Sequence, residues 1–195
     1  SNGAPVLMPW RDDVGAIVES YLGGQASGAA LAAVLLGDLE PGGRLAETFP
    51  ASLDDVASNP WFPGRTRQVQ HREGLFVGYR YQVTAGIEPL FPFGHGLGYT
   101  TFAWSGVELE RGELAPGDGA TVTLSVTNTG ERSGSDVVQV YLADRSGVVL
   151  RPERQLAGFA KVRLDAGASA VVRIDLGARA FQFYDVEARD WCTPE

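Results

Sequence analysis

The chain has 195 residues, with 24 acidic side chains against 16 basic ones and a formal net charge of −8. This acidic balance disfavours nucleic acid and anionic membranes as partners, because both attract clusters of lysine and arginine. The length predicts one or two domains, and no apolar run approaches the roughly 20 residues of a membrane span. The single cysteine, Cys192, excludes an internal disulfide and a metal site built from several cysteines.

Both ends of the chain read as possible cuts in a longer polypeptide. Residues 1–5 are loop-like and lack an initiating methionine, and residues 191–195 end the sequence abruptly after a strongly patterned region. We therefore expect a piece of a larger protein. No signal peptide opens the sequence, and in such a piece this leaves the cellular compartment unassigned.

Residues 12–49 have the character of an α/β domain. Val14, Ile17, Val18, Tyr21 and Leu22 follow helical spacing after an aspartate cap, which predicts a helix ended by a glycine pair. A second helix is predicted over 28–36, with a serine cap at 27. Residues 44–49 are predicted to form a short strand. Helix followed by strand suggests the end of an α/β domain.

Residues 50–102 are rich in proline, glycine and aromatic residues. A flexible linker is polar and poor in aromatics, so we expect an ordered connecting loop whose rings pack against neighbouring domains.

Residues 103–195 alternate with a period of two, most clearly over 122–126, 138–142 and 172–176. Turn-forming residues separate these runs, and no helical pattern lies between them. This arrangement predicts an antiparallel β-sandwich.

Residue spacing does not support a metal, phosphate or nucleophile site. His71 and His95 are far apart in sequence, and Cys192 is distant from both, so no zinc pattern forms. The glycine-rich segments 23–28 and 94–98 lack the context of a phosphate loop and predict turns. We expect the ring of His95 to bond to backbone in such a turn. Neither histidine has a serine or cysteine placed to suggest a triad.

Carboxylates are the remaining candidates, because a pair of them can act as acid/base and nucleophile. Most are expected to cap helices or face water. Glu73 lies in a loop rich in arginine and tyrosine, which predicts a structural ion pair, with a place near a ligand as the alternative. The candidate acids are Asp12, Asp13, Asp38, Glu40, Glu47, Asp54, Asp55, Glu73 and Glu88.

Four sequence motifs, which occur in the same order as in the family, resemble those of glycoside hydrolase family 3. GGRLAETFP at 42–50, REGLFVGYRY at 72–81 and PLFPFGHGLGYTTF at 89–102 resemble three signatures of that family. VVQVYL at 137–142, with the Arg-Pro and QLAGFAKV strings that follow it, resembles its closing fibronectin type III-like domain. One departure is Gly98, where the family usually has serine.

The resemblance implies an α/β fragment followed by an antiparallel β-sandwich of fibronectin type III-like fold. Residues 1–55 would be the C-terminal end of the family's α/β sandwich domain, and 56–102 the ordered connecting loop. Residues 103–195 would be the fibronectin type III-like sandwich, truncated at its last strand. Roughly the first two-thirds of such an enzyme, including a (β/α)8 barrel, would precede the chain and pack against it.

The resemblance also implies a retaining exo-acting β-glycosidase, with β-glucosidase favoured over β-xylosidase. Its substrates would be β-linked glucosides or oligosaccharides, and it needs no cofactor or metal. The family's nucleophile and acid/base motifs do not occur here. We therefore assign no catalytic residue, including Glu73, and expect this chain alone to be inactive. Two alternatives stay open: a free-standing β-sandwich that binds carbohydrate, and a purely structural module.

Overall fold

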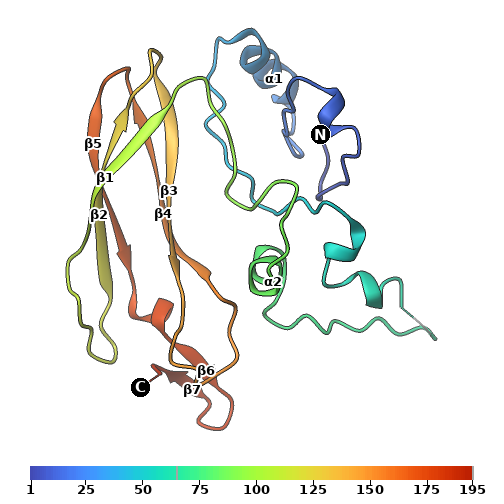
Figure 1. Cartoon of the computed structure of the whole chain (residues 1–195), viewed down its shortest axis with the longest axis vertical. Helices are drawn as coiled ribbons and strands as arrows, with labels where there is room; N and C mark the ends of the chain where they lie inside the picture. The colour runs from blue at the N-terminus through green and yellow to red at the C-terminus, as the bar shows by residue number, and fades with distance from the viewer. Residues whose placement is uncertain (65, 195) are drawn as a thin grey trace. The chain divides into compact units, whose positions relative to one another are not determined.

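The computed structural model describes residues 1–64 and 66–194 (Figure 1). The chain divides into two compact units. The first unit contains residues 1–39 and 44–96, and the second contains residues 40–43 together with the chain from 97 onward. Within the described residues, none of the helices has the length and apolar character needed to cross a membrane.

The first unit contains two α-helices, α1 (Ser27–Leu36) and α2 (Tyr79–Ala85). Helix α1 confirms the helix predicted over 28–36, and Gly37 ends it in the left-handed conformation with φ 80°. The predicted serine cap is not used, because Ala26 occupies the N-cap position and no side chain caps the helix. Alanine and leucine, which favour helix intrinsically, account for its formation.

The helix predicted from residue 12 to residue 22 is wrong. Only a 3-10 turn, η1 (Arg11–Asp13), forms at its start, and the backbone that follows is not helical. Val14, Val18 and Leu22, which would share its apolar face, are 44%, 44% and 78% exposed. A helix of this length depends on burying such a face, and β-branched residues lower its intrinsic stability further.

The strand predicted over 44–49 is present only as a short antiparallel contact with residues 91–95. Phe49 and Phe91 exchange two backbone hydrogen bonds, of 2.9 and 3.2 Å, in an isolated bridge. The N–H of Leu45 donates to the carbonyl of His95 at 2.8 Å. The carbonyl of Leu45 accepts from the N–H of Gly94, at 2.8 Å, and not from that of His95, so the register shifts and the two segments do not form a continuous ladder.

The connecting segment 56–102 is more structured than its sequence suggests, because helix α2 lies within it. Its aromatic side chains pack in pairs: the rings of Tyr79 and Phe93 stack with centroids 4.7 Å apart. The guanidinium of Arg72 lies 4.1 Å from the ring centroid of Trp61. Two 3-10 turns also belong to the first unit, η2 (Leu53–Asp55) and η3 (Asn59–Trp61).

Antiparallel strands make up most of the second unit (Figure 1). The sheets have the orders β1–β2–β5, β3–β4 and β6–β7. The predicted runs at 122–126, 138–142 and 172–176 lie in β2, β3 and β5. The strands are β1 (Phe102–Leu109), β2 (Ala120–Asn128), β3 (Gly134–Leu142), β4 (Gln155–Leu164), β5 (Ser169–Leu176), β6 (Phe183–Asp185) and β7 (Asp190–Cys192), with the 3-10 turn η4 (Ala178–Phe181) before β6.

The core of the second unit draws on both larger sheets. Leu124 and Val126 of β2 are 3% and 0% exposed, which confirms the face predicted from their alternation. They belong to one cluster with Val138 of β3, Leu164 of β4 and Ile174 of β5. This cluster gives the second unit a hydrophobic core of its own.

Candidate functional site

The acids of the first unit are held mainly in local turns. Asp55 accepts the backbone N–H of Ser52 at 2.8 Å in a capping box at the start of η2. Asp12 is paired with Arg11 at 2.8 Å. No group of three or more His, Cys, Asp or Glu residues within 1–64 and 66–194 is placed to hold a metal ion. The expectation that these acids cap turns or face water is confirmed for Asp12 and Asp55.

Glu40 belongs to the second unit and has a fixed environment. Its Oε2 accepts the N–H of Ser135 at 3.1 Å. Its Oε1 is buried without a hydrogen-bond partner and lies so close to Gly98 that a Cβ atom there would overlap it. Gly134 approaches the same carboxylate, since a Cβ atom at that residue would lie 3.2 Å from Glu40 Oε1. No local sequence pattern could predict this contact, because Glu40 and Gly98 are 58 positions apart in the chain.

The structure places Glu73 and His95 in turns of the first unit, and His71 in an exposed irregular segment of it. The carbonyl of Glu73 accepts the N–H of Phe76 at 2.9 Å, and Glu73 is half-buried. The ring of His95 stacks on Phe91 with centroids 5.6 Å apart, and the backbone N–H of His95 donates to the Pro92 carbonyl at 3.1 Å. His95 therefore lies in a turn as expected, but the hydrogen bond that the structure gives it there comes from its backbone N–H, whereas the prediction assigned such a bond to the ring, which stacks on Phe91.

A cavity of about 580 Å³ lies in the first unit, which we call the first-unit pocket. Its walls come from residues 5–7, 46–57 and 77–82, with Phe93. Three polar atoms of lining residues are buried and have no hydrogen-bond partner. They are Thr48 Oγ1, Arg80 Nε and Gln82 Oε1. Sequence reasoning did not single out Thr48 or Gln82, because their burial depends on segments distant in the chain.

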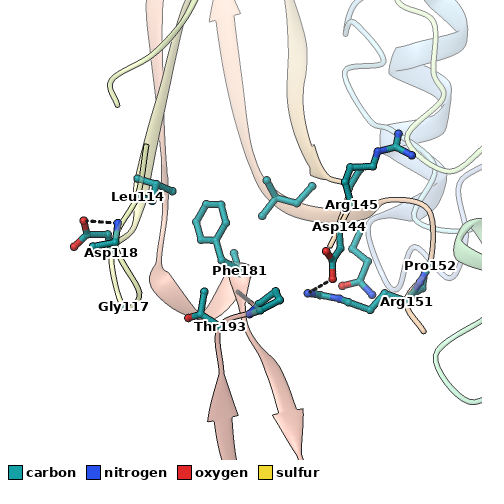
Figure 2. A pocket seen from close by; sticks show the side chains of 15 residues that line it. Leu114, Gly117, Asp118, Asp144, Arg145, Arg151, Pro152, Phe181 and Thr193 are labelled. Atoms are coloured by element: carbon teal, nitrogen blue, oxygen red, sulfur yellow. Dashed lines mark hydrogen bonds and ion pairs between the residues drawn. The ribbon is translucent and has the colours of Figure 1, made fainter. Parts of the chain in front are cut away.

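A second cavity, of about 320 Å³, lies in the second unit (Figure 2). It is lined by the loop between β1 and β2, the loop between β3 and β4, turn η4 and the residues after β7. Asp144 and Arg151 point toward one another on its wall, with 3.4 Å between Oδ2 and Nη1. Their side chains are 12% and 14% exposed. Hydrogen bonds from the hydroxyl and backbone N–H of Ser146 lower the pKa of Asp144, and Arg151 adds to this.

The chemistry available in this second cavity is limited. A general acid that acts near neutral pH needs a raised pKa, whereas that of Asp144 is lowered. Asp118, on the other side of the cavity in Figure 2, accepts the N–H of Ala115 at 3.3 Å and pairs with Arg111 at 3.5 Å. Both carboxylates therefore hold loops, and the cavity does not have the features of an acid/base site.

Two family models match consecutive parts of the chain. The Glycosyl hydrolase family 3 C-terminal domain matches residues 1–99, and the Fibronectin type III-like domain matches residues 136–195. The order of the two matches follows the order of the two compact units.

Curated relatives and solved structures agree with these matches. The thermostable beta-glucosidase B of Acetivibrio thermocellus is 48% identical over 190 residues, which are 97% of this chain and 25% of the relative. A beta-glucosidase of Rhizobium radiobacter is 46% identical over 96% of this chain and 23% of its own length. The crystal structure of DesR, a beta-glucosidase from Streptomyces venezuelae in complex with D-glucose, superposes with a TM-score of 0.90 and 38% identity.

The DesR match covers 98% of this chain and 25% of DesR. The chain thus spans about a quarter of the length of these relatives. With a family model that covers residues 1–99 and relatives that match nearly every residue, the chain belongs to glycoside hydrolase family 3 and corresponds to its C-terminal segment with the fibronectin type III-like domain.

Proposed function

We propose that this chain is the C-terminal part of a retaining, exo-acting β-glucosidase that removes terminal non-reducing sugars from β-linked glucosides or oligosaccharides. The observation that carries the proposal is the 48% identity, over 97% of this chain, to a relative named as a beta-glucosidase. The match with DesR, solved with D-glucose, supports the same substrate class.

A retaining mechanism needs two carboxyl groups about 5–5.5 Å apart, one as nucleophile and one as acid and then base. In the proposed enzyme this pair comes from the polypeptide that precedes these residues. The acids described above are committed to turns, to Ser135 or to arginines, which leaves them poorly suited to the role. The chain alone would then be inactive.

The role left to this segment is that of a scaffold. Residues 1–55 would complete the α/β sandwich domain, 56–102 would connect it to the next domain, and 103–195 would form a fibronectin type III-like β-sandwich. Catalysis by two carboxylates requires domains held to within a fraction of an ångström. The stacked rings of Tyr79 and Phe93 would stiffen the connecting segment at low entropic cost.

A chimera tests the proposal directly. Residues 1–195 replace the matching C-terminal quarter of the Acetivibrio thermocellus enzyme, and hydrolysis of 4-nitrophenyl β-D-glucopyranoside is measured. We expect the chimera to hydrolyse it, and both the isolated chain and the truncated relative to be inactive. A folded chimera without glucosidase activity, or hydrolysis by the isolated chain at an enzymatic rate, would contradict the proposal.

The scaffold role has its own test in the same chimera. Tyr79→Ala removes one ring of the stacked pair, and we expect the thermal midpoint to fall by several degrees, since such a pair contributes about 0.5–1.5 kcal/mol beyond burial. An unchanged midpoint would contradict a stiffening role for this contact.

A further inference from the structure

The cavity of the second unit, which we call the second-unit pocket, has a charged pair in its wall whose contacts are long. Asp144 Oδ2 lies 3.4 Å from Arg151 Nη1, and Arg151 Nη2 lies 3.4 Å from the carbonyl oxygen of Gln182. Charge-assisted hydrogen bonds between nitrogen and oxygen are usually about 2.7–2.9 Å long. Removing two charges from water costs free energy that strong hydrogen bonds must offset, so a ligand that bonds to both side chains would improve on these contacts.

Both side chains are within reach of a ligand. Those of Asp144 and Arg151 are 12% and 14% exposed. The cavity beside them has a volume of about 320 Å³, at the lower end of the range for small-molecule pockets, about 300–1,000 Å³. The carboxylate is also fixed in position, because Asp144 Oδ1 accepts the backbone N–H of Ser146 at 2.8 Å. A polar group that is held in place before binding lowers the entropic cost of capturing a ligand.

The charges of the pair determine which ligand fits. The Asp144 carboxylate only accepts hydrogen bonds and the Arg151 guanidinium only donates them, whereas a hydroxyl group does both. A ligand with a net charge is attracted by one member of the pair and repelled by the other, which favours a neutral ligand with several hydroxyl groups. Leu114 and Phe181 (Figure 2), together with Leu142, also line the pocket. Their apolar surface suits the C–H groups of such a ligand, since binding pockets combine an apolar lining with a few polar groups.

We propose that the second-unit pocket binds a neutral, polyhydroxylated ligand of the size of one sugar ring, with Asp144 accepting hydrogen bonds from its hydroxyl groups and Arg151 donating hydrogen bonds to them. This adds a binding role to the unit that the proposed function treats as a scaffold. It does not depend on the proposed function, because all residues that line the pocket lie between 114 and 194.

A titration of the ¹⁵N-labelled chain 1–195 with D-glucose, followed by NMR, tests the proposal. We expect saturable shifts of the Ser146 and Ala180 backbone amides, with a Kd on the order of 1 mM. Asp144→Asn should weaken binding about tenfold, because it replaces a charged acceptor by a neutral one. Ala115→Leu enlarges an exposed lining residue and should abolish the saturable shifts while leaving the charged pair in place. Ala188→Leu, at an exposed residue outside the lining, is the matched control and should bind as the unchanged chain does.

Charged and larger sugars complete the test. D-glucuronate and D-glucosamine should bind more weakly than D-glucose. Cellobiose distinguishes the two sources of this chemistry: binding at least as tight as that of D-glucose assigns the pocket to the end of an oligosaccharide, and weaker binding assigns it to a free monosaccharide. Shifts that never saturate, saturable shifts that persist in a folded Ala115→Leu variant, or tighter binding of either charged sugar would overturn the proposal.

The outcome is separate from that of the proposed function. The titration uses the isolated chain, whereas hydrolysis is measured in the chimera. An active chimera together with an isolated chain that binds no sugar supports the enzyme and overturns the pocket. An inactive, folded chimera together with saturable binding supports the pocket and contradicts the enzyme.

Discussion

The contact between Glu40 and Gly98 leads to a specific prediction about stability. Gly98 stands where the family signature usually has serine, and Gly98→Ser restores that residue. The structure predicts that this restoration is destabilising here, because the new Cβ atom would overlap Oε1 of Glu40. Gly98 does not have a positive φ, so backbone strain is not the cause.

The size of the effect follows from what Glu40 loses when it moves. Its Oε2 accepts the Ser135 N–H at 3.1 Å, and a hydrogen bond to a charged group contributes about 1.5–3 kcal/mol. Adding atoms to a filled site costs about 1–3 kcal/mol. The protein can either move Glu40 and lose its hydrogen bond, or keep Glu40 in place and accept the overlap. The two costs therefore do not add in full, and we expect the free energy of unfolding to fall by about 2 kcal/mol. For a chain of this size that corresponds to a fall of about 4–8 °C in Tm.

A double-mutant cycle measured by urea unfolding tests the cause. Glu40→Ala opens the space next to residue 98, so Gly98→Ser should cost almost nothing in that background, with a coupling energy of about 2 kcal/mol. Gly112→Ser is the control, since a Cβ atom there meets nothing within 4 Å. If Gly98→Ser cost the same with and without the Glu40 side chain, the overlap would not be the reason.

Three further predictions concern the second unit. Asn128 is 0% exposed and its side chain makes four hydrogen bonds, so Asn128→Ala should lower the urea midpoint by the equivalent of about 2–4 kcal/mol. Hydrogen bonds from Ser146 lower the pKa of Asp144, so the ionised Asp144 stabilises the fold fully above about pH 4, and this contribution is lost as the pH falls through the lowered pKa of the folded state. Asp144→Asn should therefore make the free energy of unfolding depend less on pH in that range. Gly158→Ala places Cβ 2.7 Å from Ile174 Cγ2, and Tm should fall by several degrees.

Strands β2, β3 and β5 of the second unit could be predicted because their information is local. A two-residue period fixes which side chains face inward, and the burial of Leu124 and Val126 follows it. The core formed with β3, β4 and β5 lies within the same chain. For these three strands the local pattern agrees with the partners that the chain itself supplies, so their own residues were enough to predict them. The cavity beside Asp144 and Arg151 could not be predicted in this way, because segments far apart in the sequence form it together.

The first unit could be predicted only in part, because much of its structure depends on contacts between distant segments. Its helix α1 forms from residues with high intrinsic propensity, whereas the predicted helix over 12–22 needed a surface against which to bury its apolar face, and Val14 and Leu22 remain exposed. Phe49 is 1% exposed, but few large side chains in this unit are buried with it. Hydrophobic periodicity indicates which face of a segment would be buried, but it does not identify the element that would pack against that face. The burial of Thr48 and Gln82, which are 7% and 4% exposed, likewise depends on segments distant in the chain, so a local pattern could not have predicted it.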